Sequence, residues 1–173
     1  MIRILSCREV ARSEIFARSA PKTDVAGTVS EIIRNVRERG DAALFEYCEK
    51  FDGAQLASLA VTENEIKEAL DSADPEFLDV LRRAAENITA FHSRQVRNSF
   101  ILNEKCGVVV GQKIIPVDRA GLYVPGGTAA YPSTVLMDAI PARIAGCREV
   151  VIVTPPGRDG KVNPAILAAA AAA

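Results

Sequence analysis

The stretch AGLYVPGGTAAYPSTVLMDAIPARIAGCREVVIVT, residues 120–154, decides the fold class. Its first apolar run, Ala120 to Val124, predicts a short strand that stops at Pro125-Gly126-Gly127. Pro132 follows in a position that can open a helix. The continuous apolar run 149–154 predicts a second strand, typical of a parallel sheet that is covered on both faces. Strand, loop, helix and strand in this order predict the opening of a doubly wound α/β sheet.

The segments on either side extend this pattern. Pro141 is expected to kink or divide the helix that Pro132 opens. Asn163-Pro164 predicts the start of a last helix, which closes on six consecutive alanines. Only two parallel strands are predicted, whereas a Rossmann-type sheet normally has five or six. We therefore expect an incomplete Rossmann-like sheet, truncated in mid-domain.

Upstream of residue 103 the sequence is richer in charge and in helix signals. Residues 1–103 hold 14 basic and 17 acidic residues, whereas residues 104–173 hold 7 and 5. We expect a mainly helical region over 1–103 and the start of an α/β domain over 104–173. Helices are predicted from Ser6 (with Glu9 as a capping box) to about Arg18, over 25–36 with Gly40 as the stop, over 41–50, over 62–72 from the Thr62/Glu65 capping box, and from Asp74-Pro75 to about Val96. Strands are predicted over 59–61, 99–102 and 107–115, with a turn at 103–106.

Composition excludes several classes of protein. The formal net charge is −1 and apolar residues make up 49%, which is typical of a soluble globular protein. No basic excess exists to neutralise nucleic-acid phosphates. The longest apolar run is shorter than the roughly 20 residues that span a bilayer, and no signal peptide is visible, so a cytoplasmic location is expected. The only histidine is His92, and the four cysteines form no CxxC pair, so spacing predicts no zinc site and favours free thiols.

Two loops at predicted strand ends are candidate ligand sites. Gly126 and Gly127 allow a backbone to approach a phosphate or a nicotinamide, and Tyr123 adds an aromatic face. The alternative is a tight turn with a packed tyrosine. The loop 154–157 has the equivalent place after the second strand, and its alternative is a simple turn. His92 is either a substrate contact or, more commonly for such a residue, a surface or packing residue of the long helix.

Larger segments of the chain resemble histidinol dehydrogenase. They are RERGDAAL (37–44), KFDG (50–53), RAAENITAFHSRQ (83–95), GLYVPGGTAAYPSTVLMDAIPARIAGC (121–147) and VIVTPPGRDGKVNPAILAAA (151–170). The resemblance implies an NAD-dependent oxidoreductase of histidine biosynthesis. Such an enzyme oxidises L-histidinol to L-histidine through the aldehyde and reduces two NAD. It also implies a zinc-dependent homodimer with incomplete Rossmann-like domains, similar to those of aldehyde dehydrogenases.

The resemblance assigns cofactor contacts to this chain but no catalytic or metal-binding residue. The family's aromatic NAD contact matches Tyr123, and Pro125, Gly126 and Gly127 share its loop. The zinc ligands and the acid/base pair lie in the later part of the family's chain, so no catalytic or metal residue is assigned here. The 173-residue chain is therefore expected to be inactive by itself. A related dehydrogenase of another small alcohol and a non-catalytic assembly or binding fragment remain alternatives. No nucleic-acid or membrane partner is expected.

Overall fold

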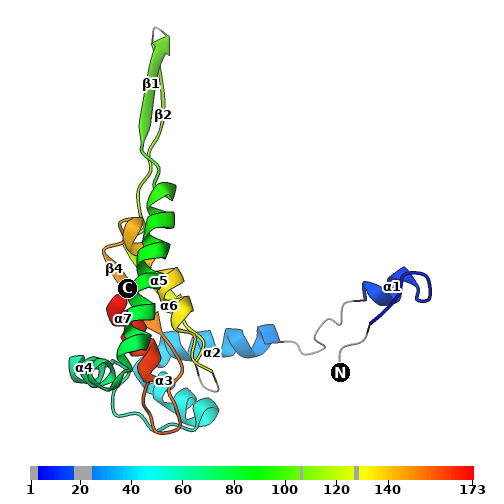
Figure 1. The fold of residues 1–173 in the computed structure, drawn as a ribbon, viewed down its shortest axis with the longest axis vertical. Helices are drawn as coiled ribbons and strands as arrows, with labels where there is room; N and C mark the ends of the chain where they lie inside the picture. Colours follow the sequence, from blue (N-terminus) through cyan, green and yellow to red (C-terminus); the bar gives the residue numbers. More distant parts are fainter. Residues whose placement is uncertain (1–3, 18–24, 106, 127–128) are drawn as a thin grey trace. The chain divides into compact units, whose positions relative to one another are not determined.

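The computed structural model describes residues 4–17, 25–105, 107–126 and 129–173. It divides into two compact units, 1–40 and 41–173 (Figure 1). The compositional change near residue 103 falls inside the second unit. The larger division into a helical region and an NAD-binding domain stays a prediction.

The described residues of the first unit form two helices, α1 (Arg12–Ile15) and α2 (Val25–Arg39). Gly40 follows α2 with φ +57°, which confirms the predicted stop. The predicted capping box at Ser6 is wrong. The backbone carbonyl of Ser6, and not its hydroxyl, accepts hydrogen bonds from the N–H groups of Glu9 and Val10, both at 3.0 Å, and so closes a turn. The four-residue helix begins only at Arg12, and the predicted end at Arg18 lies outside the described residues.

The second unit carries the remaining elements in the expected alternation. They are α3 (Asp41–Tyr47), the π-helical turn η1 (Cys48–Asp52), α4 (Glu63–Ser72), α5 (Pro75–His92), the 3₁₀ turn η2 (Ser93–Gln95), β1 (Phe100–Lys105), β2 (Val108–Gln112), β3 (Arg119–Tyr123), α6 (Pro132–Ile144), β4 (Glu149–Val153) and α7 (Pro164–Ala172). No helix in the described part of the chain is both long and apolar enough to cross a membrane.

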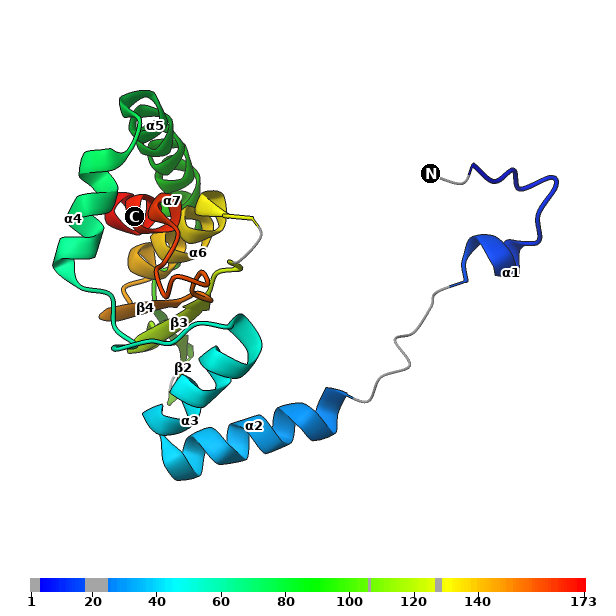
Figure 2. The same ribbon diagram turned by 90° about the horizontal axis from the view of Figure 1, so that it is seen from below.

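Strands β3 and β4 are parallel and are joined through α6, as the sequence predicts. Their register pairs Arg119 with Glu149 and Tyr123 with Val153. Figure 2 shows α5, α6 and α7 on one side of this pair and α3 on the other. The expectation of a β4 covered on both faces is wrong, because Val151 and Val153 are exposed whereas Ile152 packs against the core. The result is a mixed helix and sheet fold with a small parallel sheet.

The core lies between this sheet and the helices. Its largest fully buried side chains are Leu136, Ile166, Val124 and Val135. Leu81 of α5 joins the same cluster, and Phe77 and Ile88 pack against it. Phe91, which continues the predicted stripe of α5, is exposed instead. The carboxyl end of β3 is therefore anchored in the core through Val124, which fixes the loop that follows.

Several predicted elements differ from the observed ones in their presence or their ends. Pro141 lies inside α6 without dividing it. The predicted strand over 59–61 is absent, because the Ser58 hydroxyl bonds both the N–H (3.1 Å) and the carbonyl (3.2 Å) of Ala60. Helix α5 ends at His92 rather than near Val96. In the hairpin, β1 continues through the predicted turn to Lys105, and β2 ends at Gln112 rather than Ile115.

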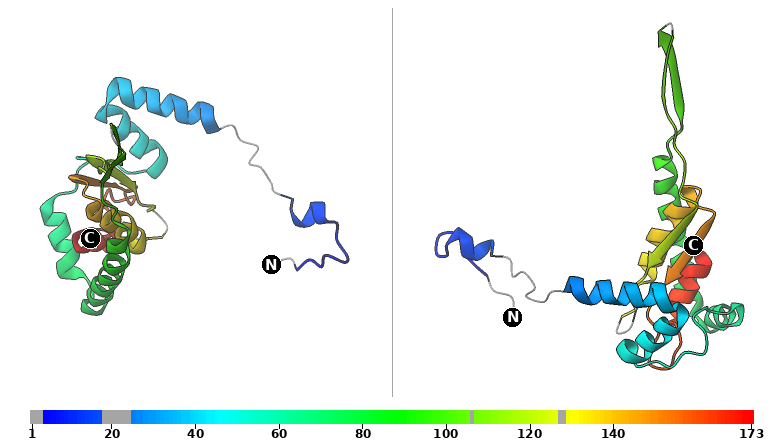
Figure 3. Two further views of the ribbon diagram at one scale, coloured as in Figure 1. Left: turned by 90° about the horizontal axis from the view of Figure 1, so that it is seen from above. Right: turned by 180° about the vertical axis from the view of Figure 1, so that it is seen from behind.

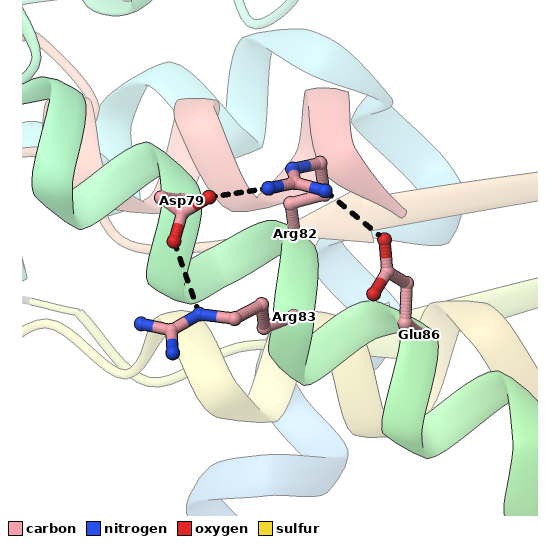
Figure 4. A network of polar contacts seen from close by, with 4 residues as sticks. All are labelled: Asp79, Arg82, Arg83 and Glu86. Atoms are coloured by element: carbon pink, nitrogen blue, oxygen red, sulfur yellow. Dashed lines mark hydrogen bonds and ion pairs between the residues drawn. The ribbon is translucent and has the colours of Figure 1, made fainter.

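Helix α5 is also stabilised along its solvent face. Figure 4 shows Asp79 bonding both Arg82 and Arg83, while Arg82 also reaches Glu86. The hydrogen bond and charge of Asp79 raise the pKa of Arg82. All four side chains are well exposed and solvent screens their charges, so these pairs contribute little to stability. These residues form a solvated helix face rather than a site.

Candidate functional site

The loops after β3 and β4 meet at one edge of the parallel sheet. The N–H of Val124 donates to the carbonyl of Val153 at 2.9 Å, so both loops start side by side. A Cβ added to Gly126 would lie 2.8 Å from Thr154 Oγ1 and 2.9 Å from the carbonyl oxygen of Pro155. Glycine is therefore required at this position by the close approach of the second loop.

A pocket of about 360 Å³, which we call the strand-end pocket, opens beside these loops. One wall comes from Tyr123, Val153 and the Pro155-Pro156 pair. Leu56, residues 58–61 and Cys48, which come from earlier in the chain, also line this pocket. The volume and the mostly apolar wall match a small-molecule or cofactor site. Tyr123 is 63% exposed, so its ring lines this space instead of packing in the core.

A second pocket of about 260 Å³ lies where the loops approach the start of α7. Gly126, Thr154, Asp159 and Lys161 line it. The Asn163 side chain accepts from the N–H of Ala165 at 2.9 Å and so caps α7. Among the described residues, buried Thr154 Oγ1 has no hydrogen-bond partner. A buried hydroxyl without a partner costs free energy, so a polar ligand atom at this edge would relieve it.

Two titratable residues that line the strand-end pocket, Cys48 and Glu65, have shifted pKa values. Burial, and then the charge of Asp52, raises the pKa of the Cys48 thiol, which keeps it protonated. The hydrogen bond from the Thr62 backbone lowers the pKa of Glu65, whose carboxylate is engaged in the capping box of α4. Among the described lining residues, the thiol of Cys48 is protonated and the carboxylate of Glu65 is engaged in a cap, so neither is placed to act as a general base.

His92 lies apart from this pocket. Its Nδ1 is 2.6 Å from Oε1 of Gln95, and the pair borders a small cavity of about 150 Å³ with Pro141 and Ile144. No group of three or more His, Cys, Asp or Glu side chains is arranged to hold a metal ion within the described ranges.

The residues predicted from the sequence are thus only partly brought together. Tyr123 lines the strand-end pocket, Gly126 lines the second pocket, Pro125 is exposed between them, and Gly127 lies outside the described residues. Sequence reasoning named the loop 154–157, which begins at Thr154, as a candidate site, but it did not single out the Thr154 hydroxyl. It missed the contribution of Leu56 and residues 58–61 to the strand-end pocket, for which the sequence carries no signal.

Comparisons with known proteins agree with the geometry. Residues 17–173 match the family model described as histidinol dehydrogenase. The histidinol dehydrogenase of Geobacillus kaustophilus is 54% identical over 82% of this chain and 34% of its own length. That of Heliobacterium mobile is 44% identical over 98% of this chain and 41% of its own length.

The crystal structure of histidinol dehydrogenase from Elizabethkingia anophelis superposes with a TM-score of 0.84 at 36% identity, over 89% of this chain and 36% of that chain. The chain thus spans about a third of the length of the relatives it matches. Because these relatives are all named histidinol dehydrogenase, the comparisons do not favour a dehydrogenase of another small alcohol. The chain belongs to the histidinol dehydrogenase family.

Proposed function

We propose that this chain supplies the NAD-binding wall of a histidinol dehydrogenase. The whole protein would oxidise L-histidinol to L-histidine through the aldehyde in histidine biosynthesis. The observation that carries the proposal is the exposed Tyr123 ring on the wall of the strand-end pocket, at the carboxyl ends of two parallel strands. In open α/β sheets ligands bind at that edge, which also supports a Rossmann-like relationship for residues 104–173.

The described residues fit a dinucleotide in three ways. The Tyr123 ring offers a flat face on which a nicotinamide or adenine ring can stack. Gly126 lets the loop after β3 approach the loop after β4 with no side chain in between, and Pro125 restricts the backbone of the loop after β3. Thr154 Oγ1 is available to a ribose hydroxyl or phosphate oxygen. NAD would supply the hydride acceptor, while these residues bind and orient it and exclude water.

Zinc, which the family resemblance implies, does not fit the described residues, since no set of three ligating side chains lies together among them. We therefore assign this chain no metal ligand and no acid/base residue. A cytoplasmic homodimer with L-histidinol as its small-molecule substrate completes the proposal.

The test separates cofactor binding from substrate binding. In a protein of full family length that carries this sequence, Tyr123→Ala is expected to raise the KM for NAD and to leave that for histidinol nearly unchanged. By analogy with bases stacked on aromatic side chains the loss is about 1–3 kcal/mol, which is roughly five- to 150-fold in KM. Tyr123→Phe tests the hydroxyl alone.

Tyr131→Ala is the matched control, because Tyr131 is also exposed but lines neither of the two pockets. Unchanged NAD kinetics for Tyr123→Ala, together with a lower melting temperature, would instead assign Tyr123 a packing role and contradict the proposal.

A further inference from the structure

The second pocket is lined by two residues of opposite charge, Asp159 and Lys161. It shares three lining residues with the strand-end pocket: Thr154, Pro155 and Val162. The two pockets are therefore adjacent along the loop after β4. A dinucleotide carries a nucleoside at each of its ends, so it is the kind of ligand that occupies two adjacent pockets.

A tight loop holds Asp159 in place. The N–H of Gly157 donates to the Lys161 carbonyl at 2.8 Å, and that of Gly160 donates to the Gly157 carbonyl at 2.9 Å. Oδ1 of Asp159 accepts from the N–H of Lys161 at 3.1 Å. A Cβ on Gly157 would lie 2.7 Å from this oxygen, so glycine leaves the space that the carboxylate occupies. Because a carboxylate has about four lone-pair sites, Asp159 can accept further hydrogen bonds from a ligand.

The order of elements places Asp159 where dinucleotide sites carry an acidic residue. Strand β3, helix α6 and the parallel strand β4 follow one another, with Gly126 in the first loop and Asp159 in the loop after β4. The right view of Figure 3 shows the segment between β4 and α7 at the end of the second unit away from the β1–β2 hairpin. In Rossmann-type sheets an acidic residue that follows the glycine-rich loop by about 20 positions hydrogen-bonds the ribose 2′-hydroxyl of NAD. Asp159 comes at a longer interval, in the corresponding loop.

The nearby cations do not turn the second pocket into a site for an additional phosphate. The backbone and side-chain hydrogen bonds from Thr62, and then the charge of Lys161, lower the pKa of Glu65. Lys161 is thus close enough to the Glu65 carboxylate for part of its charge to be offset there. Arg158 is exposed and lines neither pocket. A phosphate in the second pocket would therefore meet the Asp159 carboxylate with little compensation.

We propose that Asp159 makes this protein select NAD over NADP, an inference that rests on the NAD site proposed above. Its carboxylate accepts a hydrogen bond from the adenosine ribose of NAD. The same carboxylate repels the additional phosphate that NADP carries on the 2′ oxygen, because like charges at close range raise each other's free energy. Both effects favour NAD.

Steady-state kinetics with the two cofactors test this inference in a protein of full family length that carries this sequence. Asp159→Asn is expected to raise kcat/KM for NADP relative to that for NAD by about tenfold or more, which corresponds to about 1.4 kcal/mol. Asparagine keeps an acceptor for the Lys161 N–H, so the melting temperature should stay the same. Asp71→Asn, an exposed α4 residue outside both pockets, is the matched control and should leave the cofactor ratio unchanged.

Ionic strength separates charge repulsion from a structural effect of the substitution. Raising the salt from about 0.1 M to about 1 M shortens the screening length from about 10 Å to about 3 Å. Use of NADP relative to NAD should then improve more in the wild type than in Asp159→Asn. An unchanged cofactor ratio in Asp159→Asn, or a wild type that prefers NADP, overturns the inference. If Tyr123→Ala still weakens the use of NAD in that case, the proposed function stands; if Tyr123→Ala has no such effect, the proposed function fails as well.

Discussion

Replacing Gly126 by alanine tests the contact between the two strand-end loops. The new methyl group would lie 2.8 Å from Thr154 Oγ1, 2.9 Å from the Pro155 carbonyl oxygen and 3.3 Å from Pro155 Cδ. All three distances are below the 3.4 Å at which ordinary contact begins, and one of the atoms is backbone. Because Val124 is anchored in the core, the loop after β4 must move instead.

Overpacking of this kind costs about 1–3 kcal/mol. For a chain of this size each kcal/mol lowers the melting temperature by about 2–4 °C. Gly126→Ala is therefore expected to melt several degrees below wild type and to bind NADH more weakly. Thermal unfolding followed by circular dichroism measures the first effect, and a fluorescence titration of NADH measures the second.

Two further variants test whether the contact between the two loops causes these effects. Gly121→Ala in β3 is the matched control, since a Cβ there meets nothing within 4 Å. Gly126→Ala combined with Thr154→Ala should recover part of the lost stability, because it removes the hydroxyl contact but not the carbonyl contact. Equal melting temperatures for Gly126→Ala and Gly121→Ala would show that the loops do not meet as described.

Three other predictions concern the helices and the activity. Thr62→Ala removes the hydroxyl of the capping box, which accepts from the Glu65 N–H at 3.3 Å and donates to Glu65 Oε2 at 2.8 Å, and should cost about 1 kcal/mol in a melt at pH 7. The backbone and side-chain hydrogen bonds from Thr62 lower the pKa of Glu65, and only the side-chain bond is lost in the variant. The contribution of that bond is present above the ordinary carboxyl pKa and is lost as the pH falls through the lowered folded value; a wild-type advantage over Thr62→Ala that is constant down to pH 2 would contradict this. Leu136→Ala should cost about 2–5 kcal/mol in denaturant unfolding, whereas half-exposed Met137→Ala should cost far less. The 173-residue chain alone should neither retain stoichiometric zinc on dialysis nor form NADH from histidinol and NAD; absorbance at 340 nm that rises in proportion to protein would refute the second expectation.

The elements that could be predicted from the sequence are those whose ends are set by neighbouring residues. Thr62 with Glu65, Asp74 with Pro75, and Asn163 with Pro164 each start a helix where the pattern places it, because a side-chain oxygen bonds a backbone N–H two or three residues later. The same chemistry misleads elsewhere. Ser58 bonds Ala60 and so holds an apolar, β-branched segment out of any strand.

The part of the candidate site that lies at the end of β3 could be predicted from the sequence, because neighbouring residues also set where that strand ends. Tyr123 is the last residue of β3, a strand that the apolar pattern identifies, and Gly126 lies in the loop after it, at the edge where open α/β sheets bind their ligands. Leu56 and residues 58–61, which also line the strand-end pocket, lie more than sixty positions before Tyr123 in the chain. Their place depends on how α3 and α4 pack in the second unit, and no local pattern encodes that packing. The exposed outer face of β4 was missed because an apolar run does not show which faces the fold covers.

The central claim is that the loops after β3 and β4 form the NAD-binding wall of this chain. A titration of the ¹⁵N-labelled chain with NAD, followed by two-dimensional NMR, tests it most directly. The account predicts saturable shifts of the Tyr123, Gly126 and Thr154 amides, with the α4 amides of Lys67 to Ser72 unchanged, and loss of the shifts in Tyr123→Ala but not in Tyr131→Ala. Shifts confined to the His92 cavity, or no shifts at millimolar NAD, would contradict it.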